Sequence, residues 1–131
     1  MRHQMKNLLA ATFIAIAVSG CGDSYDKVAA DMTSSMKLLS NALKGVIDKP
    51  TAETAAAKIR AIGVSMQAIQ DRLNKLGKPT KEQGDTLNVK FSAEINQANK
   101  EITTEMARIN GLGDEVARPI NEAMAAATKR P

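Results

Sequence analysis

The residue types that carry most protein chemistry are scarce in this chain. Its 131 residues include a single cysteine, Cys21, and a single histidine, His3. A lone cysteine has no disulfide partner within its own chain, so another use must explain it. Cys21 directly follows Val18-Ser19-Gly20, at the end of an apolar run. The residues around Cys21 are therefore the first to interpret.

The first twenty residues have the organisation of an export signal. Residues 1–7 contain Arg2 and Lys6 but no acidic residue, and residues 8–18 contain neither a charge nor a proline. This apolar stretch is too short to cross a bilayer, which takes about twenty residues. The small pair Ser19-Gly20 that follows is typical of a cleavage region. The pattern predicts a cleaved signal peptide over residues 1–20.

Val18, Ser19, Gly20 and Cys21 resemble the lipobox of bacterial lipoproteins, in which an aliphatic residue and two small residues precede an obligatory cysteine. The resemblance covers only this segment. It implies a diacylglycerol thioether on Cys21, cleavage between Gly20 and Cys21, and stable anchoring by several acyl chains. The alternatives are an ordinary secretory signal with a chance cysteine and a free thiol in a cytosolic protein.

The residue after the cysteine bears on location. In the enterobacterial sorting rule that goes with the lipobox, an aspartate directly after the cysteine keeps a lipoprotein in the inner membrane. Here that residue is Gly22, and Asp23 follows it. The resemblance therefore favours the outer membrane, facing the periplasm. The inner membrane and the cell surface stay open, because sorting rules differ between bacterial groups.

Composition argues against several classes of function. Without residues 1–20 the chain keeps sixteen basic and fourteen acidic residues, a net charge of +2, and its aromatic residues are Tyr25 and Phe91. A nucleic-acid interface needs a concentrated basic face, usually with stacking aromatics. His3 would be lost with the signal peptide, which leaves no histidine for a metal, a haem or a catalytic base. We expect no nucleic-acid partner, metal, cofactor or catalytic residue.

Four stretches of the remaining chain repeat apolar residues at helical spacing. The steps of three and four residues place these side chains on one face of each helix. The four stripes are Tyr25, Ala29, Met32, Met36, Leu39, Leu43 and Val46; Ala55, Ile59, Ile62, Met66, Ile69, Leu73 and Leu76; Leu87, Phe91, Ile95, Ala98, Ile102, Met106 and Ile109; and Val116, Ile120, Ala123, Met124 and Ala127.

Two stretches with proline and threonine separate the long helices. We expect Pro50 to end the first helix and Thr51 to act as the N-cap of the second. Thr80 and Gln83 have the spacing of a capping box before the third helix. Glycines at residues 111 and 113 should end that helix.

These elements predict an all-α domain over residues 25–128, joined to the lipid by a tether of residues 21–24. The domain should be an antiparallel up-down bundle of three long helices, with a short C-terminal helix folded back over one end. Ala56 and Gly63 would let a neighbouring backbone approach closely. We expect the methionines of the stripes to fill the core rather than to form a soft binding surface, and the alanine-rich seam to leave no pocket for an apolar ligand. The pattern is similar to that of uncharacterised small alanine-rich helical envelope proteins, which implies no activity.

A basic cluster is expected near the lipid. If Cys21 lies at a membrane, the turn between the second and third helices returns to the same end of the bundle. It brings Arg72, Lys75, Lys78 and Lys81, each worth up to about 1 kcal/mol against anionic headgroups. The alternative is an ordinary solvated turn.

The sequence therefore favours a membrane-anchored, non-enzymatic interaction module of the cell envelope: an adaptor, an inhibitor or an assembly subunit with an unidentified envelope protein as partner. The end of the bundle far from the lipid is best placed to meet that partner. The alternative is a structural lipoprotein that forms homo-oligomers through leftover apolar positions. These positions are Val28, Ile47, Val64 and Val89.

Overall fold

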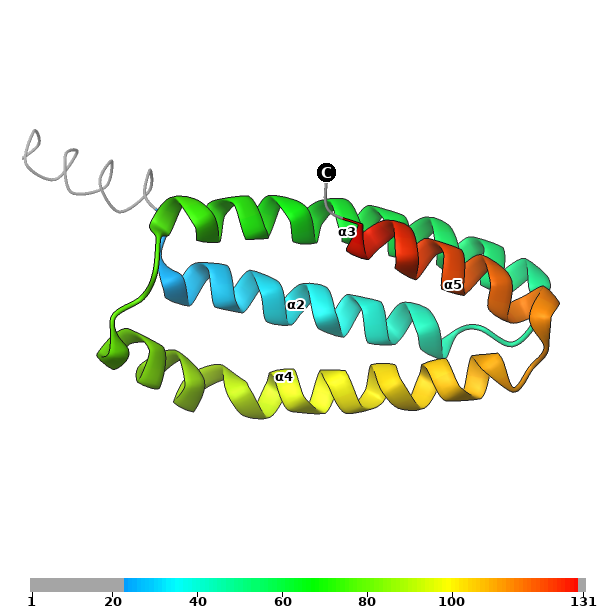
Figure 1. Cartoon of the computed structure of the whole chain (residues 1–131). Helices are drawn as coiled ribbons and strands as arrows, with labels where there is room; N and C mark the ends of the chain where they lie inside the picture. Colours follow the sequence, from blue (N-terminus) through cyan, green and yellow to red (C-terminus); the bar gives the residue numbers. More distant parts are fainter. Residues whose placement is uncertain (1–22, 130–131) are drawn as a thin grey trace, which may run out of the picture.

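The computed structural model of the protein describes residues 23–129, and within this range the chain is all-helical (Figure 1). Its four helices are α2 (Tyr25–Lys44), α3 (Lys49–Leu76), α4 (Lys81–Asn110) and α5 (Asp114–Thr128). The prediction of an all-α fold with four helices is confirmed. The predicted signal peptide, the lipobox and Gly22 lie outside the described residues.

The helices run lengthwise beside one another, with α2 between α3 and α4 (Figure 1). α2 packs against both of these helices, α5 packs along α3, and α5 makes a smaller contact with α4. This agrees with an up-down arrangement. We call the end that holds Asp23 and the α3–α4 connection the tether end. The opposite end, with the α2–α3 and α4–α5 turns, is the far end.

One neighbour relation differs from the expectation for short connections. The Cα atoms of α3 and α4 nowhere come within 8 Å of each other, although only residues 77–80 join the two helices. The connection passes the start of α2 and places α4 on the other side of that helix (Figure 1). Helix α4 therefore packs on α2, and the place beside α3 is left to α5.

Helix α5 folds back as expected, but it lies along the far half of α3 rather than over the end (Figure 1). Its last turn touches α3 at Gly63, where an added Cβ would lie 2.6 Å from the Cβ and 2.8 Å from the Cα of Ala127. Gly63 and Ala56 are both buried. The predicted close approach of a neighbouring backbone is confirmed, and the neighbour at Gly63 is α5.

The hydrophobic core lies toward the far end of the bundle. All four helices contribute to it, through the fully buried side chains of Leu43, Ile59, Ile109 and Ile120 among others. The core cluster extends from Leu39 to Ala123, within the described residues.

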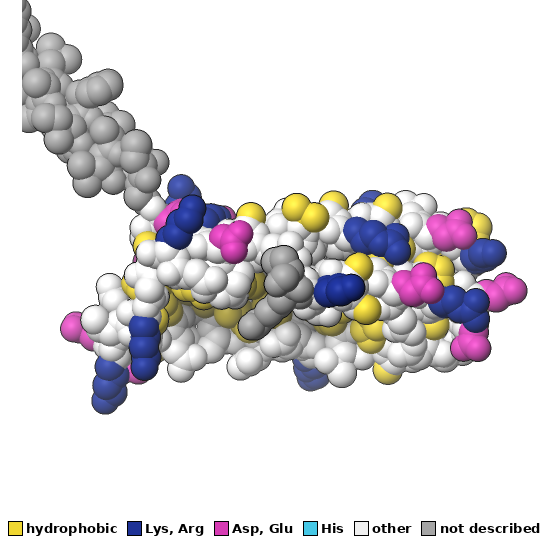
Figure 2. Space-filling view, turned by 45° about the horizontal axis from the view of Figure 1, so that its top comes forward, with side chains coloured by type: hydrophobic (Ala, Val, Ile, Leu, Met, Phe, Trp, Pro, Cys, Tyr) yellow, Lys and Arg dark blue, Asp and Glu magenta, His cyan; other side chains and the backbone are white. Residues whose placement is uncertain are grey.

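The tether half of the bundle is packed less completely. Between Lys81 and Gln97, α4 has no buried residue, and Phe91 and Ile95 of its apolar stripe stay half-buried. Figure 2 shows apolar side chains in a hollow of this half. Met32 and Met66 are also half-buried. We expected the methionines to fill the core, and in this half of the bundle that expectation is wrong.

The start of α3 differs from the prediction. Asp48, not Thr51, is the N-cap: its carboxylate accepts the N–H of Thr51 at 3.0 Å, and the Thr51 hydroxyl accepts the N–H of Asp48 at 3.0 Å. Pro50 lies in the first turn of α3, where its missing N–H costs nothing. It does not end the first helix either, because α2 has already ended at Lys44.

The start of α4 follows the prediction. The Thr80 hydroxyl accepts the N–H of Gln83 at 3.2 Å, and the Gln83 side chain accepts the N–H of Thr80 at 3.0 Å. The capping box read from the spacing is confirmed. At the other end, Gly111 caps α4 and Gly113, with φ at 107°, precedes α5.

Two glycine substitutions test the close packing of α5 on α3. We expect Gly63→Ala to lower the free energy of unfolding by about 1–3 kcal/mol, because the new methyl group meets backbone as well as side-chain atoms of Ala127. Gly84→Ala in α4, where nothing lies within 4 Å of the added Cβ, should instead raise it by up to about 1 kcal/mol. Urea unfolding followed by circular dichroism measures both. A Gly63→Ala protein as stable as Gly84→Ala would contradict this packing.

Candidate functional site at the tether end

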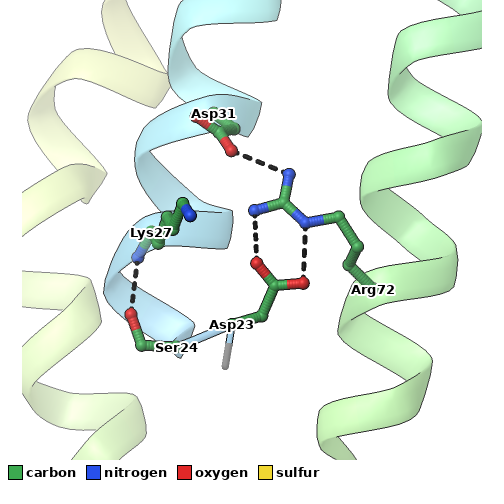
Figure 3. A network of polar contacts seen from close by, with 5 residues as sticks. All are labelled: Asp23, Ser24, Lys27, Asp31 and Arg72. Atoms are coloured by element: carbon green, nitrogen blue, oxygen red, sulfur yellow. Dashed lines mark hydrogen bonds and ion pairs between the residues drawn. The ribbon is translucent and has the colours of Figure 1, made fainter. Parts of the chain in front are cut away.

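Asp23, the first described residue, is held by a bidentate ion pair with Arg72 of α3 (Figure 3). The Nε and Nη2 atoms of Arg72 donate to the two carboxylate oxygens of Asp23 at 2.9 and 2.8 Å. Its Nη1 atom donates to Asp31 Oδ2 in α2 at 2.7 Å. Paired hydrogen bonds of this kind fix orientation as well as distance. One guanidinium therefore joins α2, α3 and the residue that precedes α2.

A second contact joins α2 to the end of α3. The Tyr25 hydroxyl donates toward the carbonyl oxygens of Leu76 and Gly77, each at 2.9 Å. Carbonyls at the end of a helix have no partner within the helix, so an outside donor satisfies them. Ser24 caps α2 by accepting the N–H of Lys27 at 3.2 Å (Figure 3). The start of α2 is thus held against the end of α3.

The ion pair between Asp23 and Arg72 stays charged at neutral pH. The hydrogen bonds from Arg72 favour the ionised carboxyl group and hold the pKa of Asp23 below its ordinary value. The two carboxylates in turn raise the pKa of Arg72. The Asp23 and Arg72 side chains are 29% and 27% exposed, so solvent screens the attraction in part. The geometry of the Asp23–Arg72–Asp31 cluster positions Asp23 against α2 and α3.

The structure separates the four cations that the sequence grouped for membrane contact. Arg72 is engaged by two carboxylates, whereas Lys75, Lys78 and Lys81 are exposed. Within residues 23–129, no ion pair involves these three lysines. They lie in or beside the α3–α4 connection, at the end that holds Asp23. Arg72 fixes Asp23, and the lysines form the basic surface of this end.

The far end carries a second fixed arrangement. Arg108 near the end of α4 donates from Nη1 to the Val46 carbonyl at 2.7 Å and from Nη2 to the Leu43 carbonyl at 3.0 Å. It thereby holds α4 to the end of α2 and its turn. The side chains of Ile47 and Leu112, in the two turns of this end, are 68% and 42% exposed. The far end thus presents exposed apolar side chains, and one of them, Ile47, lies on a turn that Arg108 holds in place.

Sequence reasoning missed Arg72 and Arg108 in these roles. The partners of Arg72 lie 41 and 49 residues away in the chain, and those of Arg108 lie 62 and 65 residues away. Val28 was also misjudged as a pairing position for oligomers, since it is 3% exposed. Ile47, Val64 and Val89 are exposed.

Features that would assign a chemistry directly are missing from the described part of the chain. No group of histidine, cysteine or acidic side chains there is arranged to hold a metal ion, and none of its helices is long and apolar enough to cross a membrane. The four lipobox residues, Val18 to Cys21, lie outside that part. Comparison with protein-family models, curated proteins and solved structures finds no match for this chain. The function has to be argued from the two ends and the surface between them.

The ion pair at Asp23 predicts a specific dependence of stability on pH. Because its pKa is lower in the folded than in the unfolded state, Asp23 stabilises the fold above the unfolded value of about 3.9. This contribution is lost as the pH falls through the lowered folded pKa. We expect Asp23→Asn to be less stable than the wild type at pH 7 and equally stable in strong acid, as measured by urea unfolding across the pH range.

The same ion pair can be tested directly by NMR titration of the Asp23 carboxyl group. In Arg72→Met the pKa of Asp23 should rise toward its ordinary value, whereas Lys58→Met, on an exposed position of the same helix, should leave it in place. An Asp23 pKa that ignores the loss of Arg72 would rule the ion pair out.

Proposed function

We propose that the protein is a lipid-anchored, non-enzymatic interaction module of the bacterial cell envelope. In this proposal, acyl chains on Cys21 hold the tether end at a membrane and the helices stand on it as an up-down bundle. α2 and α4 lead away from the lipid, and α3 and α5 return. The outer membrane, facing the periplasm, is the favoured site.

The observation that carries the proposal is the fixation of Asp23. Only Gly22 separates Asp23 from Cys21, and Arg72 binds Asp23 through two hydrogen bonds. A tether this short, fixed at once to two helices, limits both the height and the tilt of the bundle above an anchor. A domain that needed only to be retained near the membrane would work equally well on a long flexible linker.

The surfaces at the two ends support separate roles. Lys75, Lys78 and Lys81 would face anionic headgroups at the tether end. Arg72 would not, because it is bound to Asp23 and Asp31. The far end would extend away from the lipid with Ile47 and Leu112 exposed. Such a module acts by presenting a surface to an envelope protein, as an adaptor, an inhibitor or an assembly subunit.

Self-association is the second candidate function, and two side chains favour it. Val64 of α3 and Val89 of α4 are 69% and 84% exposed. Burying such side chains between copies would remove apolar surface from water. A structural lipoprotein of this kind would form homo-oligomers instead of engaging a different envelope protein.

Crosslinking in cells distinguishes the two functions. For the interaction module we expect one discrete adduct between the lipidated protein and another envelope protein, identified by mass spectrometry. A ladder of self-adducts would instead establish the structural oligomer. Cys21→Ala should remove the lipid mass, because the residue that carries the acyl chains is gone. If mass spectrometry of the wild-type protein finds no lipid mass on Cys21, the anchor is wrong.

The basic surface is tested with vesicles. Replacing Lys75, Lys78 and Lys81 together by glutamine should weaken binding of the lipidated protein to anionic vesicles, by up to about 1 kcal/mol for each lysine, and not to neutral vesicles. Arg72 is kept, because its loss would also release the tether. The control replaces Lys49, Lys58 and Lys100, which lie elsewhere, and removes the same charge. Equal loss in both variants would show that net charge matters and the position does not.

A further inference from the structure

Helix α5 occupies only part of the place that the bundle offers beside α3. It has 15 residues, whereas α3 has 28. From the last turn of α5 a groove of about 660 Å³ continues along α3 toward the tether end. Met32 and Leu39 of α2 line it together with Ile62 and Met66 of α3. This corrects the expectation that the seam leaves no room for an apolar occupant.

The groove combines an apolar interior with a neutral polar edge. Gln67, Gln70 and Asn74 follow the α3 side toward the tether end, and all three are exposed. The charged residues that line it are Asp71 and Lys129. Methionine side chains adapt to the shape of what they contact. An apolar interior with a polar edge is the usual anatomy of a protein interface.

The same half of the molecule lacks a fourth helix. With α5 ending beside Gly63, α2, α3 and α4 continue to the tether end without it (Figure 1). The backbones of α3 and α4 stay more than 8 Å apart there, and Phe91 and Ile95 of α4 remain half-buried. The bundle thus has four helices in its far half and three in its tether half. Figure 2 shows the resulting hollow with apolar side chains in it.

We propose that the tether half of this groove binds an amphipathic α-helix of the protein's envelope partner, seated where a longer α5 would run. The inference deepens the proposed function and rests on it for the partner's location. Its main support is continuity. α5 already occupies the far half of the same place, where it buries Ala117, Ile120 and Ala123. In the far half, the element that packs in this place is therefore a helix with small and branched apolar residues.

The dimensions and charges of the groove define the partner's helix further. Residues 64–76 of α3 extend about 20 Å at 1.5 Å per residue, which suits a helix of three to four turns. Its apolar residues would recur at i, i+3, i+4 and i+7, as in other helix-in-groove complexes. Because Gln67, Gln70 and Asn74 carry no charge, its flanking positions should be neutral or polar, with a cation favoured only where they meet Asp71.

A helix suits this groove better than other occupants. A helix about 10 Å wide can rest against both α2 and α3, which line the groove, whereas a single acyl chain would cover only its floor. Two copies anchored on one membrane would bring groove against groove at the same height, and two concave surfaces do not complement each other. Both alternatives are outcomes of the tests below.

The first test lengthens α5 in the protein itself. Residues 22–128 are followed by three to four further helical turns with small apolar residues on one face, in place of residues 129–131. We expect a clear rise in the urea midpoint of unfolding and changed methyl NMR signals for Met32 and Met66. The same extension with serine and glutamine on that face should give neither. Absence of any difference between the two extensions would overturn the proposal without touching the lipid anchor.

A charge placed in the groove supplies the matched control. Met66→Glu should abolish the gain from the apolar extension, because it would bury an unpaired carboxylate. Val64→Glu, which changes a residue that is 69% exposed on the same helix, should keep the gain. Gln70→Glu alters the edge at an exposed position, so it tests the groove even if Met66→Glu fails to fold.

The second test uses the full lipidated chain in cells, with a photo-crosslinking residue at Gln70 and, as the control, at Val64. We expect the Gln70 adduct to map to an amphipathic helical segment of another envelope protein, and its yield to fall at least about tenfold with Met66→Glu. An adduct with lipid, or with a second copy of the chain, would overturn the proposal. A third variant carries the photo-crosslinking residue at Ile47. A heterologous adduct there but none at Gln70 would leave the proposed function standing and remove the groove from it.

Discussion

The guanidinium of Arg72 joins the parts of the tether half that the hydrophobic core does not reach. It binds Asp23, which precedes α2, and Asp31, which lies in α2. The core cluster begins only at Leu39. In the first turns of α2, burial of apolar side chains therefore contributes little beyond Val28. Directional polar contacts, those of Arg72 and of the Tyr25 hydroxyl, determine how the helix ends meet there.

This division explains why one bundle can be firm at one end and open at the other. The far half has four helices, a closed core and a turn held by Arg108, and it needs no occupant to be complete. The tether half has three helices and an apolar groove that remains half-exposed. Regions with few buried contacts open at lower free-energy cost than the core. The polar contacts at Arg72 and Tyr25 keep the groove walls in place at that end.

The sequence predicted those features that local spacing determines. The apolar stripes gave four helices, the Thr80–Gln83 spacing gave a capping box, and Gly63 marked a close helix contact, all of which the structure contains. At the start of α3, Asp48 and Thr51 are both good capping residues. Spacing alone did not show which of them would precede the first turn.

The features that sequence reasoning missed depend on which helices become neighbours. The α3–α4 connection is short enough for a hairpin, yet α4 packs on the side of α2 that faces away from α3. That placement leaves the groove open, and it leaves Met32 and Met66 on a surface where the stripes suggested a core. Arg72 looked like one of four equivalent cations, because its partners Asp23 and Asp31 belong to another segment of the chain. Long-range pairing of this kind leaves no periodic trace in a single sequence.

The fixed tether and the open groove constrain each other if both proposals hold. The groove runs along residues 59–74 of α3, and α3 ends at Leu76, where the Tyr25 hydroxyl holds it. Its open half therefore lies within about 20 Å of the tether end, at 1.5 Å per helical residue. A helix that docks there must itself lie close to the lipid surface, so the partner would present an amphipathic segment next to its own membrane anchor. A long, flexible tether would remove this restriction, which gives the contact between Arg72 and Asp23 a role in selecting the partner.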